Sequence, residues 1–139
     1  MTTTPEVPIK VGVQRAFENL QSTFASWQFV SFPDGQGGLW VEAKEVALGA
    51  PYAQQTTFLA FLLPFALPTV DIYPMFVRPD LSRLDGGPLG PAFQSTSMSW
   101  PGEPEPRPVT QVSRITKGNF AAQTASQKIT KVLGWMKAQ

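Results

Sequence analysis

The sequence contains neither cysteine nor histidine, and these two absences exclude more chemistry than any other feature of its composition. Without thiols the chain can form no disulfide, no thiolate nucleophile, no cysteine–zinc site and no thioester. Without imidazole it lacks the commonest general base near neutral pH, so serine–histidine and cysteine–histidine mechanisms are excluded unless engineered substitutions are present. Carboxylate, lysine and serine chemistry remains open, and the composition favours a protein that is not an enzyme.

An excess of charge of one sign is missing as well. With 11 lysines and arginines against 10 aspartates and glutamates, the formal net charge is +1, and no block of either sign occurs. We therefore expect neither a nucleic-acid partner nor a membrane surface. The opening residues, MTTTPEVPIK, lack the pattern of a secretory signal, and no apolar stretch reaches the roughly 20 residues that span a bilayer. The expected location is the cytoplasm.

Two apolar runs form the expected centre of the fold. The first, residues 58–63, ends at Pro64, and the second, residues 70–77, ends at Arg78-Pro79-Asp80. Short apolar runs with proline flanks favour buried strands, and we expect these two to pair side by side. The next segment, as far as about Gln94, is a glycine- and proline-rich loop, and functional sites concentrate in segments of this kind.

Hydrophobic periodicity predicts the remaining elements. Apolar residues at helical spacing predict a helix over Lys10–Ser26 and another over Phe120–Lys137, the latter capped by Asn119. The later turns of the second helix contain Lys128, Lys131 and Lys137, where lysines stabilise the C-terminal end of the helix dipole. Trp27–Phe32 and Leu39–Leu48 predict a hairpin with a bulge near its end. The expected fold class is α+β, with a four-stranded antiparallel meander sheet packed by an N-terminal and a C-terminal helix, and a long loop after the fourth strand.

Some finer expectations concern the loops and the domain limits. We expect one domain over residues 9–139 after a disordered lead at residues 1–8. Val109–Thr116 alternates weakly and predicts a short edge strand. Trp40 lies on the charged side of its strand, which indicates either a contact surface or a tryptophan half covered by a helix or loop. The apolar residues of the long loop, which should fasten it to the domain, are Leu84, Leu89 and Phe93.

The long loop also carries the carboxylates that a residual hydrolase would use, Asp80 and Asp85, beside Arg78 and Arg83. The alternative is a solvated cluster in which these charges neutralise one another, as exposed pairs commonly do. Gly86-Gly87 lacks the flanking residues of a phosphate-binding loop. Since two carboxylates without histidine make no defined ligand set, we expect neither a metal nor another cofactor.

The order of these elements, together with several short motifs, resembles the ubiquitin-conjugating (UBC) fold, and in particular the bacterial ubiquitin-conjugating-like proteins. In that fold a helix and an antiparallel meander lead to a Tyr-Pro element, a His-Pro-Asn-like tripeptide and an active-site loop, and helices close the domain. The resemblance implies that the matching positions form the binding site. These positions are Tyr73-Pro74, Arg78-Pro79-Asp80, Asp85-Gly86, Trp100 and Ser113-Arg114, while Leu81, Pro101, Thr124 and Trp135 match further motifs of the family.

The chain departs from active members of that family at the residues that perform the chemistry. They carry ubiquitin as a thioester on a loop cysteine, and residues 81–99 contain none. Asp80 replaces the asparagine whose amide stabilises the oxyanion, and a carboxylate would repel that charge. The resemblance thus implies a non-catalytic module that binds a ubiquitin-like or activating-enzyme-like protein in a bacterial protein-modification or defence-type system. Two alternatives stay open: a transferase whose cysteine between Pro88 and Ser97 was substituted, and a structural or assembly subunit of similar layout.

Overall fold

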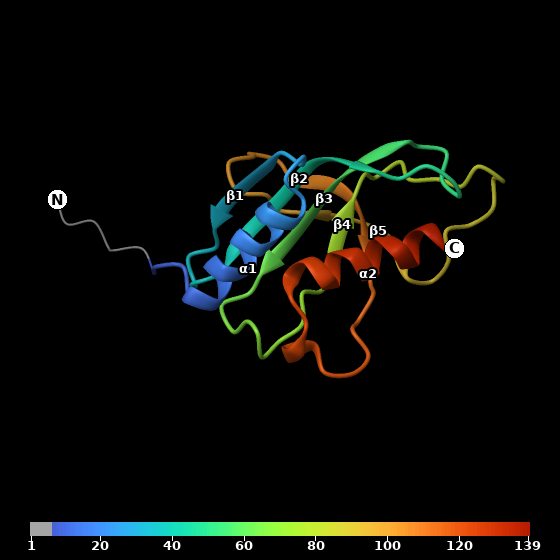
Figure 1. Ribbon diagram of the computed structural model, residues 1–139. Coiled ribbons are helices and arrows are strands. Elements are labelled where there is room, and N and C mark those ends of the chain that lie inside the picture. Colours follow the sequence, from blue (N-terminus) through green and yellow to red (C-terminus); the bar gives the residue numbers. More distant parts are fainter. Residues whose placement is uncertain (1–6) are drawn as a thin grey trace.

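The computed structural model describes residues 7–139, in which a helix precedes the strands and a second helix follows them (Figure 1). The predicted disordered lead, residues 1–8, lies outside the described residues except for its last two. Within the described range no helix has the length and apolar character needed to cross a membrane. The elements are α1 (Val11–Thr23), β1 (Phe29–Pro33), β2 (Leu39–Ala47), β3 (Thr56–Leu63), β4 (Met75–Val77), β5 (Phe93–Met98), β6 (Arg107–Val112), the 3-10 turn η1 (Phe120–Ala122) and α2 (Ala125–Lys137).

The strands form one sheet of six in the order β1-β2-β3-β4-β6-β5, and every neighbouring pair is antiparallel. The α+β class, the first hairpin, the bulge in β2 and the pairing of β3 with β4 are confirmed. The prediction of a four-stranded sheet is wrong, since β5 and β6 extend the sheet beyond β4. The prediction that residues 109–116 form an edge strand is also wrong, because β6 lies between β4 and β5.

β5 is the strand that the sequence does not reveal. Its central residues, Gln94–Ser97, are all polar and exposed, so it lacks the apolar alternation that marks a half-buried strand. Its backbone pairs with β6 from Phe93 opposite Val112 to Met98 opposite Arg107. Main-chain hydrogen bonding therefore defines β5, and the pattern of its side chains contributes little.

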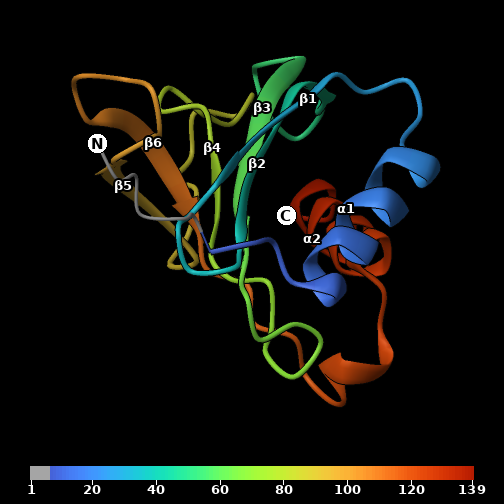
Figure 2. The same ribbon diagram turned by 90° about the vertical axis from the view of Figure 1, so that its left-hand side faces the viewer.

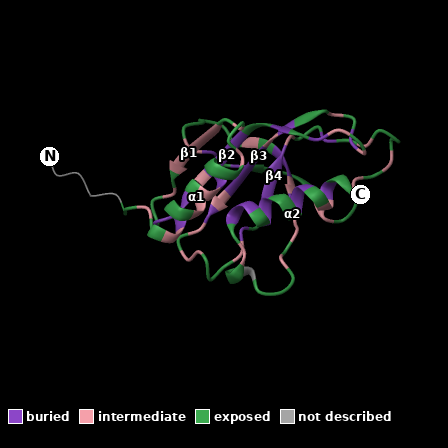
Figure 3. Cartoon of the chain, in the orientation of Figure 1, coloured by how far each residue is buried: buried purple, intermediate pink, exposed green. Residues whose placement is uncertain are grey.

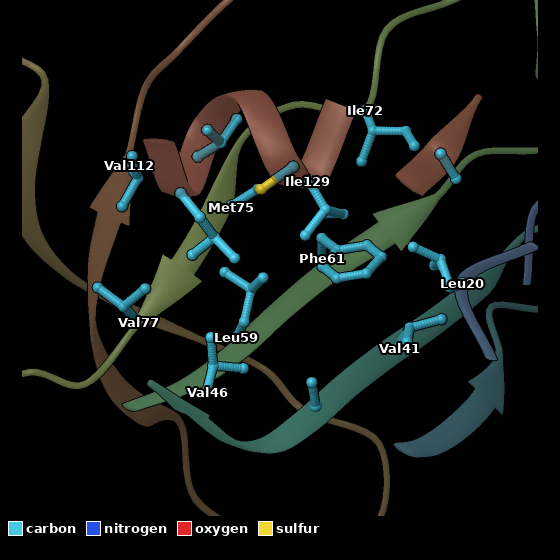
Figure 4. Close-up of a cluster of buried hydrophobic side chains, with 14 of the residues drawn as sticks. Leu20, Val41, Val46, Leu59, Phe61, Ile72, Met75, Val77, Val112 and Ile129 are labelled. Carbon is cyan, nitrogen blue, oxygen red and sulfur yellow. The ribbon is translucent and has the colours of Figure 1, made fainter. Parts of the chain in front are cut away.

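Both helices lie on the same side of the sheet and pack against each other (Figure 2). Figure 4 shows Phe61 of β3 next to Ile129 of α2, and Leu20 of α1 nearby in the same cluster. All three side chains are fully buried, and burying each is worth roughly 1.5–3 kcal/mol. Along α2, buried and exposed residues alternate as expected of an amphipathic helix that covers a sheet (Figure 3).

The opposite side of the sheet carries a second, smaller apolar cluster that includes Ala60, Phe76 and Trp100. Trp100 lies in the connection between β5 and β6. Its ring contacts Trp40 edge-on, with the ring centroids 5.8 Å apart. Trp40 is therefore half covered by this connection, which is the second of the two interpretations that its sequence position allowed.

α2 begins at Ala125 and not at Phe120, so the predicted cap is displaced. The side chain of Asn119 accepts a hydrogen bond from the amide of Ala121 at 3.1 Å and caps η1. Thr124 is the N-cap of α2: its hydroxyl accepts from the amide of Gln127 at 3.1 Å, and the Gln127 side chain accepts from the amide of Thr124 at 2.8 Å. This reciprocal pair is a capping box, in which Thr and Gln stand three residues apart.

Thr124→Ala should lower the free energy of unfolding by about 1 kcal/mol, because it removes the acceptor for one of the unpaired amides at the start of α2. Thr130→Ala is the matched control, since Thr130 is exposed in the middle of the same helix, where alanine has the higher helix propensity. Urea unfolding followed by circular dichroism measures both. Equal stability of the two variants would show that the capping box contributes nothing.

Candidate functional site

The loop that follows β4 brings Arg78 and Asp80 into a bidentate ion pair. Nε and Nη2 of Arg78 donate to the two carboxylate oxygens of Asp80 at 2.6 and 2.8 Å. Nη1 of Arg78 donates to the carbonyl of Thr56 at 2.9 Å, which fixes the arginine to the start of β3. The hydrogen bonds from Arg78 lower the pKa of Asp80. Asp80 is therefore ionised at neutral pH, with both oxygens already bound.

The second carboxylate of the loop, Asp85, is arranged in the same way. Arg83 donates to it through Nε at 3.1 Å and Nη2 at 3.3 Å, and the amide of Gly87 donates to its Oδ1 at 2.8 Å. The hydrogen bonds from Arg83 and Gly87 lower the pKa of Asp85. Gly86, which lies between Asp85 and Gly87, has a φ of +74°, a conformation that glycine adopts without strain. The Gly-Gly pair thus forms a turn around Asp85.

Neither carboxylate is prepared to act as a general base. The side chains of Asp80 and Asp85 are 60% and 62% exposed, and each is neutralised by an arginine two residues earlier. A carboxylate is most effective as a general base at neutral pH when burial or a like charge raises its pKa, whereas the pKa values of both of these are lowered. The arrangement matches a solvated, mutually neutralising cluster.

The loop is fastened to the connection between β2 and β3. Nε2 of Gln54 donates to the carbonyl of Asp80 at 2.9 Å, and its Oε1 accepts from the amide of Ser82 at 3.0 Å. The amide of Leu84 donates to the carbonyl of Pro51 at 2.9 Å. Sequence reasoning missed Gln54, because a glutamine in a linker carries no recognisable signal. It also placed Leu84 against the domain, which is wrong: 66% of Leu84 is exposed.

Tyr73-Pro74 and Ser113-Arg114 lie together at the other end of β4. Met75 of β4 pairs with Val112 of β6, and the carboxylate of Asp71 accepts a hydrogen bond from the Thr116 amide at 2.8 Å. Because both motifs lie between these two contacts, the two segments run alongside each other. The guanidinium carbon of Arg114 lies 5.2 Å from the ring centroid of Trp135. The Trp135 ring also stacks on Phe93, with centroids 5.4 Å apart. Residues predicted separately thus meet beside α2.

Trp100 belongs to neither group, because it lies on the side of the sheet away from the helices. It contacts Arg107, whose guanidinium carbon lies 5.0 Å from the Trp100 ring centroid and 5.1 Å from that of Phe58. Nη1 of Arg107 donates to Glu42 at 2.9 Å, and Nη2 donates to Glu103 at 2.8 Å. Arg107 and Glu42 stand far apart in the sequence, and no local pattern predicts their pairing. Trp100 is therefore a packing residue of the second cluster.

A largely buried polar network surrounds Lys128 and Asp71. The side chain of Lys128 is 2% exposed and that of Asp71 12%. Nζ of Lys128 donates to Asp71 at 3.0 Å, to the hydroxyl of Thr116 at 2.8 Å and to the carbonyl of Arg114 at 2.8 Å. The three donor positions of the ammonium group are thereby filled. The network joins the segment before β4, the segment after β6 and α2.

Lys128 has a different role from the one that its sequence position predicts. With Lys131 and Lys137 it is expected in the later turns of the final helix, where lysines stabilise the C-terminal end of the helix dipole. That prediction is wrong for Lys128, which lies near the start of α2 and points into the domain. Burial acts to raise the pKa of Asp71, yet the hydrogen bonds from Thr116 and Lys128 outweigh it and lower that pKa on balance. Asp71 is therefore ionised at neutral pH, and its hydrogen bonds with Lys128 and Thr116 hold three segments of the chain together.

The candidate site residues thus fall in separate parts of the molecule and form no single constellation. Within residues 7–139 no group of three or more acidic side chains gathers closely enough to hold a metal ion. No protein-family model, curated protein or solved structure matches this chain. The geometry offers an ordered, charge-neutral loop and a surface beside α2 formed by Arg114 and Trp135.

Proposed function

We propose that the protein is a non-catalytic binding module of the UBC-like type, which binds a ubiquitin-like protein or a partner enzyme in a bacterial protein-modification or defence-type system. The observation that carries the proposal is the order of the first elements. α1 is followed by β1-β2-β3-β4, which are neighbours in sequence order and antiparallel. The Tyr73-Pro74 element precedes β4, and the loop with Asp80 follows it. β5 and β6 lie beyond β4 and leave this order intact.

The side chains of the loop support a binding role over a transfer reaction. The chain has no thiol to form a thioester and no imidazole to activate a hydroxyl. Asp80, which the family resemblance matches to the oxyanion-stabilising asparagine, presents two oxygens that already accept hydrogen bonds from Arg78. A carboxylate in that state stabilises no developing negative charge. The loop is nevertheless fixed by Gln54 and Thr56, as a surface for recognition requires.

A titration monitored by NMR tests this proposal. A ubiquitin-like protein from a bacterial conjugation operon is added to the isotope-labelled protein, and an unrelated acidic protein of similar size serves as the control. We expect residue-specific shifts for the ubiquitin-like protein and none for the control. In a parallel reaction with the matching activating enzyme and ATP, we expect no covalent adduct on denaturing gels.

Each other outcome would overturn the proposal. A covalent adduct would make the protein a transferase that uses an oxygen or nitrogen nucleophile. The absence of shifts at partner concentrations of about 1 mM, which corresponds to only about 4 kcal/mol of binding energy, would favour a structural or assembly role.

A further inference from the structure

A groove of about 380 Å³ lies between α2 and the segment that follows β6. Val132 and Lys128 on α2 are 2% exposed and form its floor together with Thr116. The side chains that line the walls come from both segments, and they are Arg114, Ile115, Lys117, Lys131 and Trp135.

The groove is positively charged without an acidic side chain among its lining residues. Lys128 is neutralised by Asp71, but among the described residues no ion pair includes Arg114, Lys117 or Lys131. The whole chain carries a formal charge of only +1, so these three cations are a local concentration. Such a concentration attracts carboxylates and repels basic segments.

The groove also offers an apolar contact surface. Ile115 is 60% exposed although it is a large apolar residue. Trp135 is half-buried, and its ring is fixed in position by stacking on Phe93 and by the guanidinium of Arg114. A rigid aromatic ring next to an arginine is a common centre of protein interfaces, because both provide contact area at low entropic cost.

We propose that this groove binds a short, extended, acidic segment of a partner protein. Acidic side chains of the segment pair with Lys117 and Lys131 at one end and with Arg114 at the other, and an apolar side chain between them packs on Ile115 and Trp135. From Lys128 to Trp135 the helix rises about 10 Å, which equals about three residues of extended chain. The inference deepens the proposed function and rests on it, since it identifies the surface and the partner chemistry of that binding role.

A nucleic acid fits these observations less well than an acidic peptide. A protein that tracks a phosphate backbone presents a stripe of basic residues that neutralises many phosphates. Here Arg114, Lys117 and Lys131 line one short groove, and the exposed Ile115 lies between the first two in the chain. Binding to single-stranded oligonucleotides is therefore a competing outcome of the test.

The test measures fluorescence polarisation of a fluorescein-labelled peptide, Gly-Ser-Asp-Glu-Leu-Asp-Glu-Gly-Ser, against the full chain. We expect binding that weakens as salt rises, as charge pairing at a surface predicts. The double variant Lys117→Glu with Lys131→Glu should weaken it at least tenfold. The control is Lys10→Glu with Lys44→Glu, which changes the net charge equally at exposed lysines outside the groove and should retain binding within about twofold.

Amide shifts in the labelled protein should be confined to residues 114–117 and 128–135. Three outcomes would each overturn the groove proposal. The two double variants could weaken peptide binding equally, an oligonucleotide could bind more tightly than the peptide, or the folded protein could fail to bind the peptide. If the peptide binds but no ubiquitin-like protein does, the proposed function fails and the groove proposal stands. If a ubiquitin-like protein binds and shifts other residues only, the groove proposal fails and the proposed function stands.

Discussion

Replacing Asp71 with asparagine should lower the free energy of unfolding by about 3–5 kcal/mol, the usual loss when one partner of a buried ion pair is removed. Asparagine keeps the shape of aspartate but puts an amide, which can donate, where a carboxylate oxygen accepts from Lys128. The ammonium group of Lys128 would then be a buried charge without a counter-ion. Since small domains have about 5–15 kcal/mol of stability, this loss is a large share of the total.

The controls for this prediction separate the buried pair from charge in general. Asp80→Asn removes the same group from an exposed pair with Arg78 and should cost no more than about 1 kcal/mol. Asp71→Asn combined with Lys128→Met should be more stable than Asp71→Asn alone, because no unpaired buried charge remains. A loss for Asp71→Asn no larger than that for Asp80→Asn would show that the network is dispensable.

The pH dependence of these variants provides a second measurement of the same pair. The pKa of Asp71 is lowered in the folded state, so the unfolded chain takes up a proton at higher pH than the folded chain does. The contribution of Asp71 to the free energy of unfolding is therefore fully present at neutral pH. It is lost as the pH falls below the ordinary pKa of aspartate, about 3.9. The stability difference between the natural chain and Asp71→Asn should shrink over that window, while the other carboxylates titrate in both proteins and cancel.

Local features were the ones that the sequence could predict. The helical spacing of Val13 and Leu20 placed α1 correctly, and both residues are fully buried. The shift of phase near Val46 predicted the bulge in β2. β5 was missed because Ser and Thr residues show no alternation, and its position depends on pairing with β6. The start of α2 was misplaced since both Asn119 and Thr124 are good capping residues, and η1 uses the first.

The candidate site shows the same division between local and distant contacts. Arg78 with Asp80, and Arg83 with Asp85, stand two residues apart, so their mutual neutralisation could be proposed from the sequence and matches the geometry. The pair of Asp71 and Lys128 joins elements that meet only in the folded chain. The groove beside α2 likewise combines Arg114 and Trp135, which the family resemblance named separately, with Lys117 and Lys131, which no sequence pattern linked to them.

Arg107→Met should also lower the free energy of unfolding by about 3–5 kcal/mol, because it leaves Glu42 as a buried carboxylate without its counter-ion. Only 8% of the Glu42 side chain is exposed, and its oxygens accept from Nη1 and Nη2 of Arg107 at 2.9 and 3.4 Å. The guanidinium also contacts the rings of Phe58 and Trp100, and methionine would keep part of that apolar contact. The carboxylate of Glu42 therefore dominates the expected loss, and urea unfolding followed by tryptophan fluorescence measures it.

Two further variants distinguish the buried carboxylate from the exposed one that binds the same arginine. Glu103→Gln affects a side chain that is 40% exposed, so solvent screens its charge and the variant should lose far less stability than Arg107→Met. Glu42→Gln combined with Arg107→Met should restore part of the stability lost in Arg107→Met, because the charge that needed a partner is gone. If the double variant is no more stable than Arg107→Met, packing of the guanidinium between Phe58 and Trp100 is what stabilises this side of the sheet.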